Sequence, residues 1–511
     1  MSKTKNTDKA GISRRHLLTG LGATAVLGAA PASVAVPAGG IKNWDITVDV
    51  LVAGSGAAGI CAAIEAKMAG ATVLVIESLP KPGGSSAMSG GVIYAGGGTD
   101  LQRALGIQDS VQDMYSFLVA GSGKHPQLDK IQLYCEQSVA HFDWLLDRGI
   151  TYTPKFTDAK GLPMGDESLY FSGNEQAWPM RDRVPPVPRG HVPGVAGMNG
   201  GRTLMERLLA AAEALGVKLQ GNTPGQSLVV ESDGRVSGMV VAMDGVSKTI
   251  RARGGVVLAC GGFIHNREMM KRYAPELYDC SVPWGNAADL GDGINMGIAV
   301  GAEALRMHEG FAIAPIYPPE NVISGILVNA SGQRFVPEDS YHGVLGHNIA
   351  YHQGGKAWLI TDQRSSYQSR QDNFLQVAQG NTIGDIASQV GFPRGALQNT
   401  VAYYNRYALN GSDPLFNKGG AYLRPLQGPP YKAWDLSVDK GFFPAHTFGG
   451  LHTRTGGQVV NSFNQDIPGL FAAGRNTAGL PTAPYFASGL SLGDCTFFGR
   501  LAGQSAAAEK S

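Results

Sequence analysis

The chain of 511 residues is too long for one small module and fits two interleaved domains or one large α/β body. Charged residues make up 16%, against a usual share of about 25%, whereas 71 glycines are roughly twice the average frequency. The formal net charge of +1 argues against nucleic acid or acidic lipid as a partner. Five scattered cysteines without a CxxC or CxxCH motif predict no metal site, covalent haem or disulfide framework.

The N-terminal segment, residues 1–45, is typical of a leader followed by a linker. Arg14 and Arg15 precede a run of small and apolar residues that ends at Ser33-Val34-Ala35, a small-x-small cleavage pattern. We expect export by the twin-arginine route to the periplasm or cell envelope. The alternative interpretations of the segment are a disordered basic tail or a membrane anchor, and the alternative location of the protein is the cytoplasm. No other run of about twenty apolar residues occurs, which predicts no stable membrane span in the mature chain.

The next segment predicts a dinucleotide-binding βαβ unit. From Thr47 an apolar strand leads into Gly54, Gly56 and Gly59 in GxGxxG spacing, then an alanine-rich helix and a second strand that ends at Glu77. The glycines allow a tight turn, close approach of the backbone to a pyrophosphate and packing of the helix on the strand. The Glu77 carboxylate suits hydrogen bonds from a ribose diol and disfavours a cofactor that carries a 2′-phosphate. The pattern therefore favours nucleotide binding over a purely structural glycine-rich turn.

Later segments favour a flavin over a nicotinamide. The small-residue loop from Lys81 to Gly91 follows the ribose-binding acid and offers N–H and hydroxyl groups to a longer cofactor. Two further apolar strands close on glycine, GVVLACGG at 255–262 and IPGLFAAGR at 467–475, so one cofactor domain is expected from both ends of the chain. No second complete GxGxxG unit occurs, which points to an external electron acceptor such as a quinone rather than to NAD(P)H.

Taken in order, these motifs resemble the fumarate reductase/succinate dehydrogenase flavoprotein superfamily. The resemblance rests on GSGAAG, the GGSS and SGG loop, GDGINMG at 291–297, IPGLFAAG, and SGLSLGD at 488–494. It implies an α/β fold: a glutathione-reductase-like FAD-binding Rossmann domain (46–305 and 440–511) with an inserted α+β capping domain (306–439), and substrate held between the two. Succinate dehydrogenases attach FAD through a histidine where this chain has Ser85 and Ser86, so the resemblance implies non-covalent FAD.

The candidate cofactor-binding residues come from all of these motifs. They are Gly54, Gly56, Ala57, Ala58, Gly59, Glu77, Ser78, Gly84, Ser85, Ser86, Ser89, Gly90, Gly91, Gly261, Asp292, Gly474, Ser491 and Leu492.

Differences between this chain and other members of the superfamily narrow the class of substrate. Dicarboxylate reducers carry an arginine in the glycine-rich segment after the last FAD strand, where it pairs with a substrate carboxylate. Here that segment, 479–489, has no charged residue. His446 matches a substrate-carboxylate histidine of those enzymes, but without the arginine we expect it to form hydrogen bonds near the flavin. The uncharged, aromatic segment is instead similar to 3-ketosteroid dehydrogenases, and the sequences at 325–343 and 484–494 resemble the Δ4-(5α)-dehydrogenases in particular.

That resemblance implies four catalytic residues. The cap tyrosine of those enzymes falls on Tyr341, and the serine of their Tyr-Ala-Ser-Gly motif falls on Ser488. This chain reads Tyr-Phe-Ala-Ser-Gly, so Tyr485 corresponds to the second tyrosine only with a shift of one residue. The alternative is that Phe486, at the aligned position, packs on the steroid and Ser488 alone donates a hydrogen bond. Gly489 supplies the backbone N–H that grips the carbonyl together with the tyrosine.

Desaturation beside a ketone removes a proton from the α-carbon and a hydride from the β-carbon. Tyr485 and the Gly489 N–H are expected to stabilise the developing enolate, as an oxyanion hole does. Tyr341 would take the proton as a phenolate or through a relay, for which neighbours must lower its pKa from about 10. FAD N5 would take the hydride, and the helix that begins near Gly489 would point its N–H groups at the flavin N1/O2 edge.

Three functions remain open at this stage. The first is an FAD-dependent 3-ketosteroid dehydrogenase acting at C4–C5. The second is an enone or 2-enoate reductase of the fumarate or urocanate type, which uses such a site in reverse. The third is a non-catalytic flavin electron carrier. The lack of a CxxCH motif and of a fused domain favours the dehydrogenase.

Overall fold

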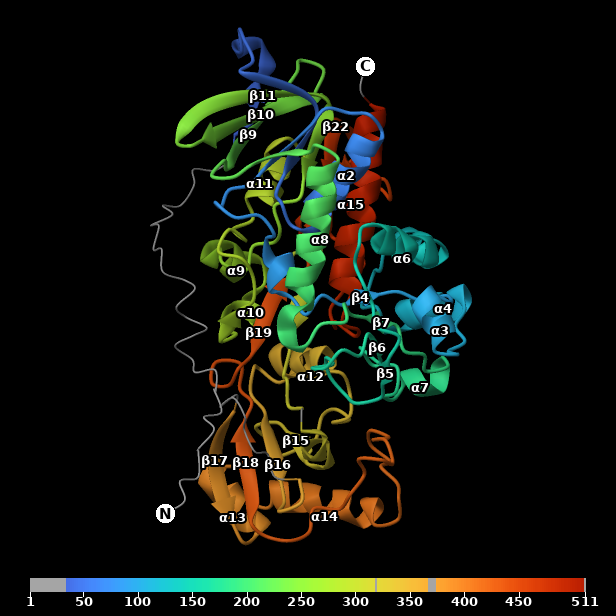
Figure 1. Cartoon of the computed structure of the whole chain (residues 1–511). Helices are drawn as coiled ribbons and strands as arrows, with labels where there is room; N and C mark the ends of the chain where they lie inside the picture. Colours follow the sequence, from blue (N-terminus) through green and yellow to red (C-terminus); the bar gives the residue numbers. More distant parts are fainter. Residues whose placement is uncertain (1–33, 318, 366–373, 510–511) are drawn as a thin grey trace, which may run out of the picture.

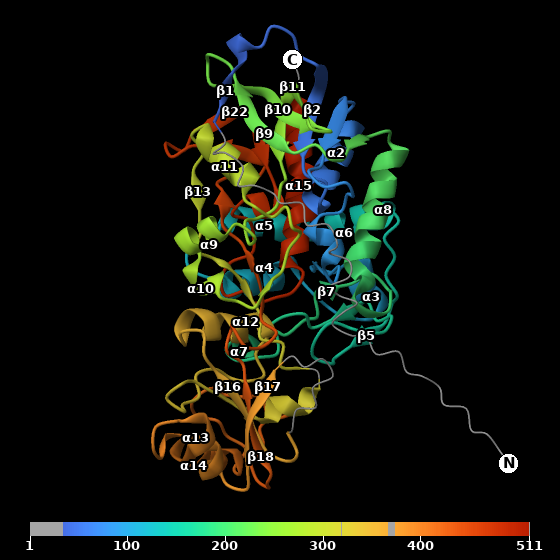
Figure 2. The same ribbon diagram turned by 90° about the vertical axis from the view of Figure 1, so that its left-hand side faces the viewer.

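The structure, a computed structural model, describes residues 34–317, 319–365 and 374–509. The predicted twin-arginine motif, Arg14 and Arg15, therefore lies outside the described residues, and export stays a prediction. Figure 1 shows a body with a large sheet at the top, a smaller body at the bottom and a helical lobe at the side. Figure 2, turned by 90°, shows the same order from top to bottom.

The upper body is built on a nine-stranded mixed sheet. Its parallel part contains β22 (Asp466–Ala472), β11 (Val246–Leu258), β2 (Ile46–Ala53), β3 (Val73–Ile76) and β8 (Lys218–Gln220). Strands β2 and β3 are almost continuously apolar because helices or loops cover both faces. The antiparallel strands β10 (Val236–Met243) and β9 (Gly225–Val230) extend the sheet beyond β11, and the short strands β1 (Val36–Pro37) and β21 (Gln458–Val460) complete it.

Both ends of the chain meet on this sheet. The alanine-rich helix α2 (Ala57–Met68) packs along α15 (Leu490–Ala508), with α8 (Gly200–Ala214) beside α2 (Figure 1). A Cβ at Gly499 would stand 2.4 Å from the Ala58 carbonyl oxygen, and one at Gly503 would stand 2.0 Å from that of Ala62. Small residues on both helices therefore permit a backbone-to-backbone contact that larger side chains would prevent.

The lower body is an α+β unit. Its antiparallel sheet has the order β15-β16-β18-β17, and two helices cover the sheet. The elements are β15 (Ile326–Val328), β16 (Trp358–Thr361), β17 (Leu375–Gly380), α13 (Ile383–Val390), α14 (Ala396–Ala408) and β18 (Tyr431–Asp435). Strands β14 (Gly310–Ala312) and β19 (Pro444–Thr447) pair with each other where the chain enters and leaves this unit, and α12 (His342–His347) lies between the two bodies (Figure 1).

The side lobe, residues 93–191, is not recognisable as a separate unit in the sequence analysis. A sheet of two-residue strands, in the order β4-β7-β6-β5, carries five helices around it. These elements are β4 (Ile93–Tyr94), α3 (Asp100–Ala104), α4 (Val111–Gly121), α5 (Leu128–Glu136), α6 (Ser138–Asp147), β5 (Phe156–Thr157), β6 (Leu169–Tyr170), α7 (Met180–Arg183) and β7 (Gly190–His191). Strands this short carry no readable hydrophobic period.

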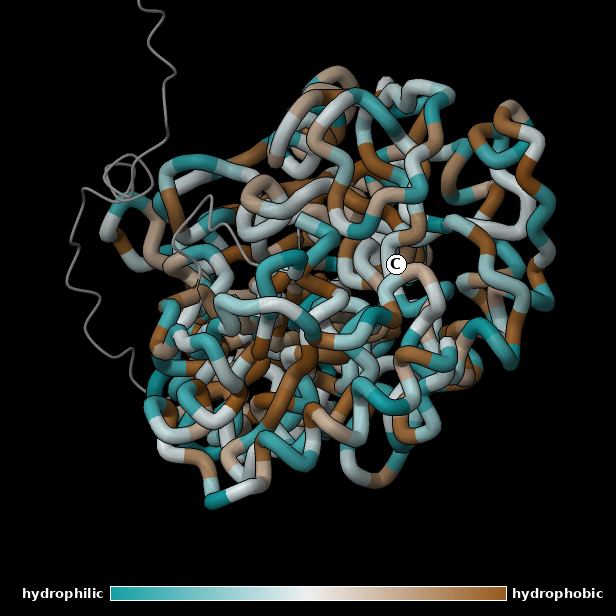
Figure 3. Tube along the Cα trace, turned by 90° about the horizontal axis from the view of Figure 1, so that it is seen from below, coloured by the Kyte–Doolittle hydropathy of each residue, from teal (hydrophilic) through white to brown (hydrophobic). Residues whose placement is uncertain are grey.

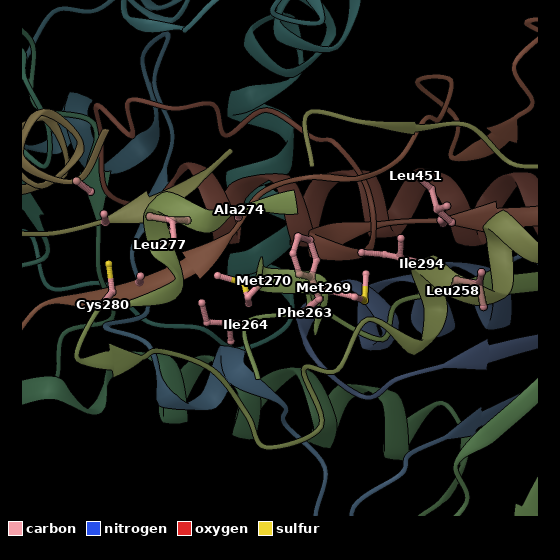
Figure 4. Close-up of a cluster of buried hydrophobic side chains, with 14 of the residues drawn as sticks. Leu258, Phe263, Ile264, Met269, Met270, Ala274, Leu277, Cys280, Ile294 and Leu451 are labelled. Carbon is pink, nitrogen blue, oxygen red and sulfur yellow. The ribbon is translucent and has the colours of Figure 1, made fainter. Parts of the chain in front are cut away.

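The largest hydrophobic cluster joins the upper body to the cap. Figure 4 shows its central part, in which Phe263, Met269 and Ile294 pack together from α9 (Arg267–Tyr273), α11 (Asp292–Ala299) and the loop before them. The remaining elements near this cluster are α10 (Pro275–Tyr278), β12 (Val282–Pro283), β13 (Ala304–Leu305) and β20 (Gly450–Leu451). Figure 3, seen from below, shows hydrophobic and hydrophilic segments alternating along the chain. The predicted fold class, a Rossmann-type FAD domain with an inserted α+β cap, is confirmed.

Candidate active site

A long cavity opens at the carboxyl ends of the parallel strands, where ligands bind in α/β sheets. Its empty space is about 1180 Å³, including the open mouth. All but three of the predicted cofactor residues line it: Gly54, Gly56, Ala57, Ala58, Glu77, Ser78, Gly84, Ser85, Ser86, Ser89, Gly261, Asp292, Gly474, Ser491 and Leu492. The sequence therefore located fifteen of the residues that line the cavity, from separate motifs.

The three predicted residues that do not line the cavity are glycines with packing roles. A Cβ at Gly59 would stand 1.9 Å from the Gly54 carbonyl oxygen, so this glycine lets α2 pack on β2. A Cβ at Gly90 would stand 2.9 Å from the Leu162 side chain, and one at Gly91 would stand 2.2 Å from the Gly200 backbone. Gly91 also has a left-handed φ of +77°. Gly59 and Gly91 need glycine because backbone atoms lie against them, whereas a Cβ at Gly90 would meet only the end of the Leu162 side chain.

Glu77 forms the acidic part of the wall and is only 7% exposed. Its Oε2 accepts hydrogen bonds from the Ser55 N–H (3.0 Å) and hydroxyl (2.6 Å). Its Oε1 accepts from the Leu79 N–H (3.0 Å) and the Ser78 hydroxyl (3.2 Å). Each carboxylate oxygen thus has one fixed backbone donor and one hydroxyl donor that can rotate away. A ribose diol can replace the two hydroxyls without disturbing the backbone.

Replacing Glu77 with alanine should weaken FAD binding strongly. Each lost hydrogen bond to the carboxylate is worth about 1.5–3 kcal/mol, which corresponds to roughly a 10- to 100-fold rise in the Kd. Titration of the apoprotein with FAD measures this, and Glu206→Ala, an exposed position on α8, is the matched control. An unchanged Kd for Glu77→Ala would move ribose recognition to another part of the cavity.

The second glycine-rich loop is hydrogen-bonded to a charged pair, Asp289 and Arg475, that no sequence motif had predicted. The Ser85 hydroxyl donates to Asp289 Oδ2 (2.8 Å) and accepts from the Asn286 N–H (2.8 Å). Arg475 donates to the same Asp289 oxygen through Nη2. Asp289, Asn286 and Arg475 all line the cavity. Arg475 is the last residue of the IPGLFAAGR motif, so this motif could have identified it. No local sequence pattern marks Asp289.

Several buried polar atoms on the cavity wall have no protein partner within the described residues. They are Arg475 Nη1, His446 Nε2 and Ser491 Oγ. Buried polar groups are normally hydrogen-bonded, so these atoms fit a bound group that is rich in donors and acceptors, as FAD is. Burial, and then the nearby Arg475, hold the pKa of His446 well below its usual value, so the imidazole is neutral.

An aromatic region adjoins the cavity wall at His446 and Ser491. The Tyr485 ring is buried and lies edge-on to Phe311, with ring centroids 5.0 Å apart, and its centroid is 6.3 Å from that of Tyr341. The Tyr485 hydroxyl accepts a hydrogen bond from the Ser491 N–H (3.1 Å) at the start of α15. Phe486 instead packs on Phe117 of the side lobe, with centroids 5.5 Å apart. Tyr485, rather than Phe486, therefore faces the cap tyrosine.

One N–H group at the start of α15 already has a partner within the protein. We expected the first N–H groups of the helix near Gly489 to point at the flavin, but the Ser491 N–H is taken by the Tyr485 hydroxyl. Leu492 and the Ser491 side chain remain on the cavity wall. Gly489 caps α15 with a left-handed φ of +99°, and a Cβ there would stand 2.6 Å from the Tyr94 nitrogen, so no other residue fits.

Ser488 and Tyr341 approach this region from opposite bodies. Ser488 is held by two backbone contacts to Ser172: its N–H donates to the Ser172 carbonyl (2.9 Å), and its carbonyl accepts from the Ser172 hydroxyl (2.9 Å). Burial, followed by Tyr485, raises the pKa of Tyr341 well above its usual value, and the Ser488 side chain offsets only part of this. The expectation that neighbours lower this pKa was wrong, because burial outweighs the polar contact.

Within the described ranges no group of three histidine, cysteine or acidic residues is arranged to hold a metal ion. No helix in that part of the chain is long and apolar enough to cross a membrane.

Comparison with known proteins agrees with the geometry. A family model described as an FAD binding domain matches residues 49–489. The urocanate reductase of Eggerthella lenta is 30% identical over 490 residues, covering 90% of this chain and 75% of that protein. The 3-oxosteroid 1-dehydrogenase of Mycolicibacterium smegmatis is 28% identical over 556 aligned positions, covering 89% of this chain and 96% of that protein.

A solved structure is similar over nearly its whole length. The 3-ketosteroid-Δ4-(5α)-dehydrogenase of Rhodococcus jostii RHA1, crystallised with 4-androstene-3,17-dione, superposes with a TM-score of 0.88 and 40% sequence identity. The match covers 93% of this chain and 99% of that one. With the motifs, the cavity and the family model in agreement, the chain belongs to the FAD-binding family of fumarate reductase/succinate dehydrogenase flavoproteins and is an FAD-dependent oxidoreductase.

Proposed function

We propose that the protein desaturates the C4–C5 bond of a 3-ketosteroid and passes the electrons to an external acceptor such as a quinone. One observation carries the proposal: Tyr485 of the FAD domain and Tyr341 of the cap lie together in an aromatic region beside the cofactor cavity. A steroid is an apolar ligand with a carbonyl at one end, which such a region suits. The similar Rhodococcus structure, which contains a 3-ketosteroid, supports the same substrate class.

The Tyr485 hydroxyl is the group that binds the substrate carbonyl. Its oxygen accepts the hydrogen bond from the Ser491 N–H and lies near the Gly489 N–H, so its own proton is free to be donated. Donation to the C3 carbonyl stabilises the negative charge that forms on that oxygen as the C4 proton leaves. When bound, FAD supplies the acceptor for the hydride from C5.

Tyr341 accepts the proton that leaves C4. Because its pKa is raised by burial, the phenol carries its proton at neutral pH and acts as one member of a relay. Its oxygen accepts the proton from C4 while its own proton moves to a neighbouring oxygen. The Ser488 side chain interacts with both Tyr341 and Tyr170, which makes the serine hydroxyl the next group in that relay.

FAD should be held without a covalent bond. Ser85 and Ser86 stand where succinate dehydrogenases attach FAD, and the two thiols on the cavity wall are unreactive because burial raises the pKa of Cys260 and Cys495 to about 12. Acid precipitation of the purified protein should release all yellow colour into the supernatant. Colour that stays in the precipitate would contradict the proposal.

A second candidate, an enoate reductase, is favoured by one pair of groups. His446 and Arg475 line the cavity with unpartnered nitrogens, as a site for a carboxylate would. Two features weaken this candidate: His446 is neutral, and Asp289 already pairs with Arg475. An anaerobic experiment separates the functions. A dehydrogenase is bleached by a 3-ketosteroid, an enoate reductase reduced with dithionite is reoxidised by fumarate or urocanate, and a non-catalytic carrier responds to neither.

A further inference from the structure

One segment of the side lobe, residues 172–175, lies between the two halves of the proposed site. It follows β6 and runs antiparallel to the segment that contains Tyr485 and Ser488, with Gly173 bridged to Ala487. Ser172 makes the two hydrogen bonds to Ser488 described above, and the Asn174 N–H donates to the Phe486 carbonyl (2.8 Å). The side lobe thus fixes the backbone that carries the carbonyl-binding tyrosine.

The side chain of Asn174 extends this connection to the cap. Its Oδ1 accepts a hydrogen bond from the Tyr341 N–H (2.9 Å), and Asn174 is only 5% exposed. Tyr341 is the residue before the first turn of α12, so its N–H has no partner inside that helix. Asn174 is therefore bonded to the backbone of the cap tyrosine on one side and to the segment of the second tyrosine on the other.

The segment is itself braced by a buried acid. Glu175 accepts from the Gly173 N–H (2.8 Å) and from the Tyr94 hydroxyl (3.2 Å), and it is 1% exposed. The Tyr94 N–H donates in turn to the Gly489 carbonyl (3.2 Å). These contacts leave the backbone around Asn174 little freedom, so the position of its side-chain oxygen is set by the side lobe.

Further polar contacts join the same lobe to the cap. Lys160 donates through its N–H to Glu320 (2.7 Å) and through Nζ to the Asp339 carbonyl (2.7 Å). Arg181 lies 3.6 Å from the Asp339 carboxylate. The lobe therefore contacts the cap at Glu320 and Asp339, which both precede Tyr341 in the chain.

We propose that Asn174 is a positioning residue that sets the distance between Tyr341 and the Tyr485–Gly489 segment. The inference rests on the proposed function for the roles of the two tyrosines, but the hydrogen bond that it uses does not. A displacement of about 1 Å in such a site can cost as much as 100-fold in rate. Loss of the Asn174 acceptor should therefore slow substrate-driven flavin reduction while leaving FAD in place.

The test compares three variants of the FAD-loaded enzyme. Asn174→Leu has a similar size but no acceptor, and Asn174→Asp keeps an oxygen for the Tyr341 N–H. Asn410→Leu, at an exposed helix end, is the control. We expect Asn174→Leu to slow anaerobic flavin reduction by about 10- to 100-fold at saturating substrate, with the aspartate variant and the control within threefold of wild type. Equal losses in both Asn174 variants, or no loss in the leucine variant, would overturn the inference.

Two readouts separate positioning from a merely structural effect. In the Tyr341→Phe background, Asn174→Leu should cost almost nothing more, because both act on the same group; full additivity would contradict the inference. Without substrate, amide hydrogen exchange at Tyr341 should speed up in Asn174→Leu and not in Asn174→Asp. If the exchange changes as expected but no ketosteroid reduces the flavin, the proposed function fails while the contact made by Asn174 stands.

Discussion

Tyr341→Phe should slow flavin reduction by a 3-ketosteroid about 10²- to 10⁴-fold, the usual contribution of a general base. The ring that packs near Tyr485 stays, so steroid binding and FAD content should change little. Anaerobic stopped-flow measurement of flavin bleaching gives the rate at saturating steroid. Tyr403→Phe, on the outer helix of the cap, is the control and should keep the wild-type rate. A wild-type rate for Tyr341→Phe would make the cap tyrosine a structural residue and remove the proposed proton acceptor.

The pH dependence gives the same prediction a second readout. Because burial raises the pKa of Tyr341, its protonated form persists through neutral pH, and the deprotonated form becomes available only as the pH rises. The relay uses the protonated phenol, so the wild-type rate should stay level from neutral pH upward for as long as Tyr341 keeps its proton. A wild-type rate that rises with pH over that range, with the rise lost in Tyr341→Phe, would show that a phenolate and not the relay accepts the proton.

Tyr485→Phe should cost about 10²- to 10³-fold in the rate of flavin reduction, the effect of removing one donor from an oxyanion hole. The change also leaves the Ser491 N–H without its acceptor, so a modest loss of stability is expected as well. The thermal midpoint of the loaded enzyme separates this loss from the effect on rate.

Variants at Phe486 and Ser488 test whether Tyr485, shifted by one residue, corresponds to the second tyrosine of the related dehydrogenases. Phe486→Leu should lower stability and leave the rate nearly unchanged, because Phe486 packs on Phe117 inside the side lobe. Ser488→Ala should slow the reaction through the relay, but less than Tyr485→Phe. If Tyr485→Phe were silent and Ser488→Ala severe, the assignment of Tyr485 would be wrong and the serine alone would bind the carbonyl.

The sequence was informative where function depends on short local motifs. The Gly54–Gly59 turn, Glu77 and the Ser85–Ser89 loop each carry their chemistry within a few residues, and all contribute to the cavity wall. Gly90 and Gly91 do not line the cavity, and a glycine that permits packing looks the same in sequence as one that contacts a ligand. Only the contact with Gly200 and Leu162, from elsewhere in the chain, separates the two roles.

Contacts between distant segments could not be predicted in the same way. Asp289 meets Ser85 and Arg475 across about 200 residues of chain on either side, and Asn174 meets Tyr341 from a lobe whose strands are too short to show a period. The pKa of Tyr341 went the opposite way from the expectation because burial, which a single sequence does not give, decides it.

The most direct test of the account is anaerobic titration of the oxidised enzyme with a saturated 5α-3-ketosteroid, followed by identification of the product. We expect bleaching of one flavin per steroid consumed and a product with a C4–C5 double bond conjugated to the ketone. Failure of 5α-3-ketosteroids to bleach the flavin, with reoxidation of the reduced enzyme by fumarate or urocanate instead, would contradict it. A product desaturated at C1–C2 would keep the substrate class and overturn the assigned position.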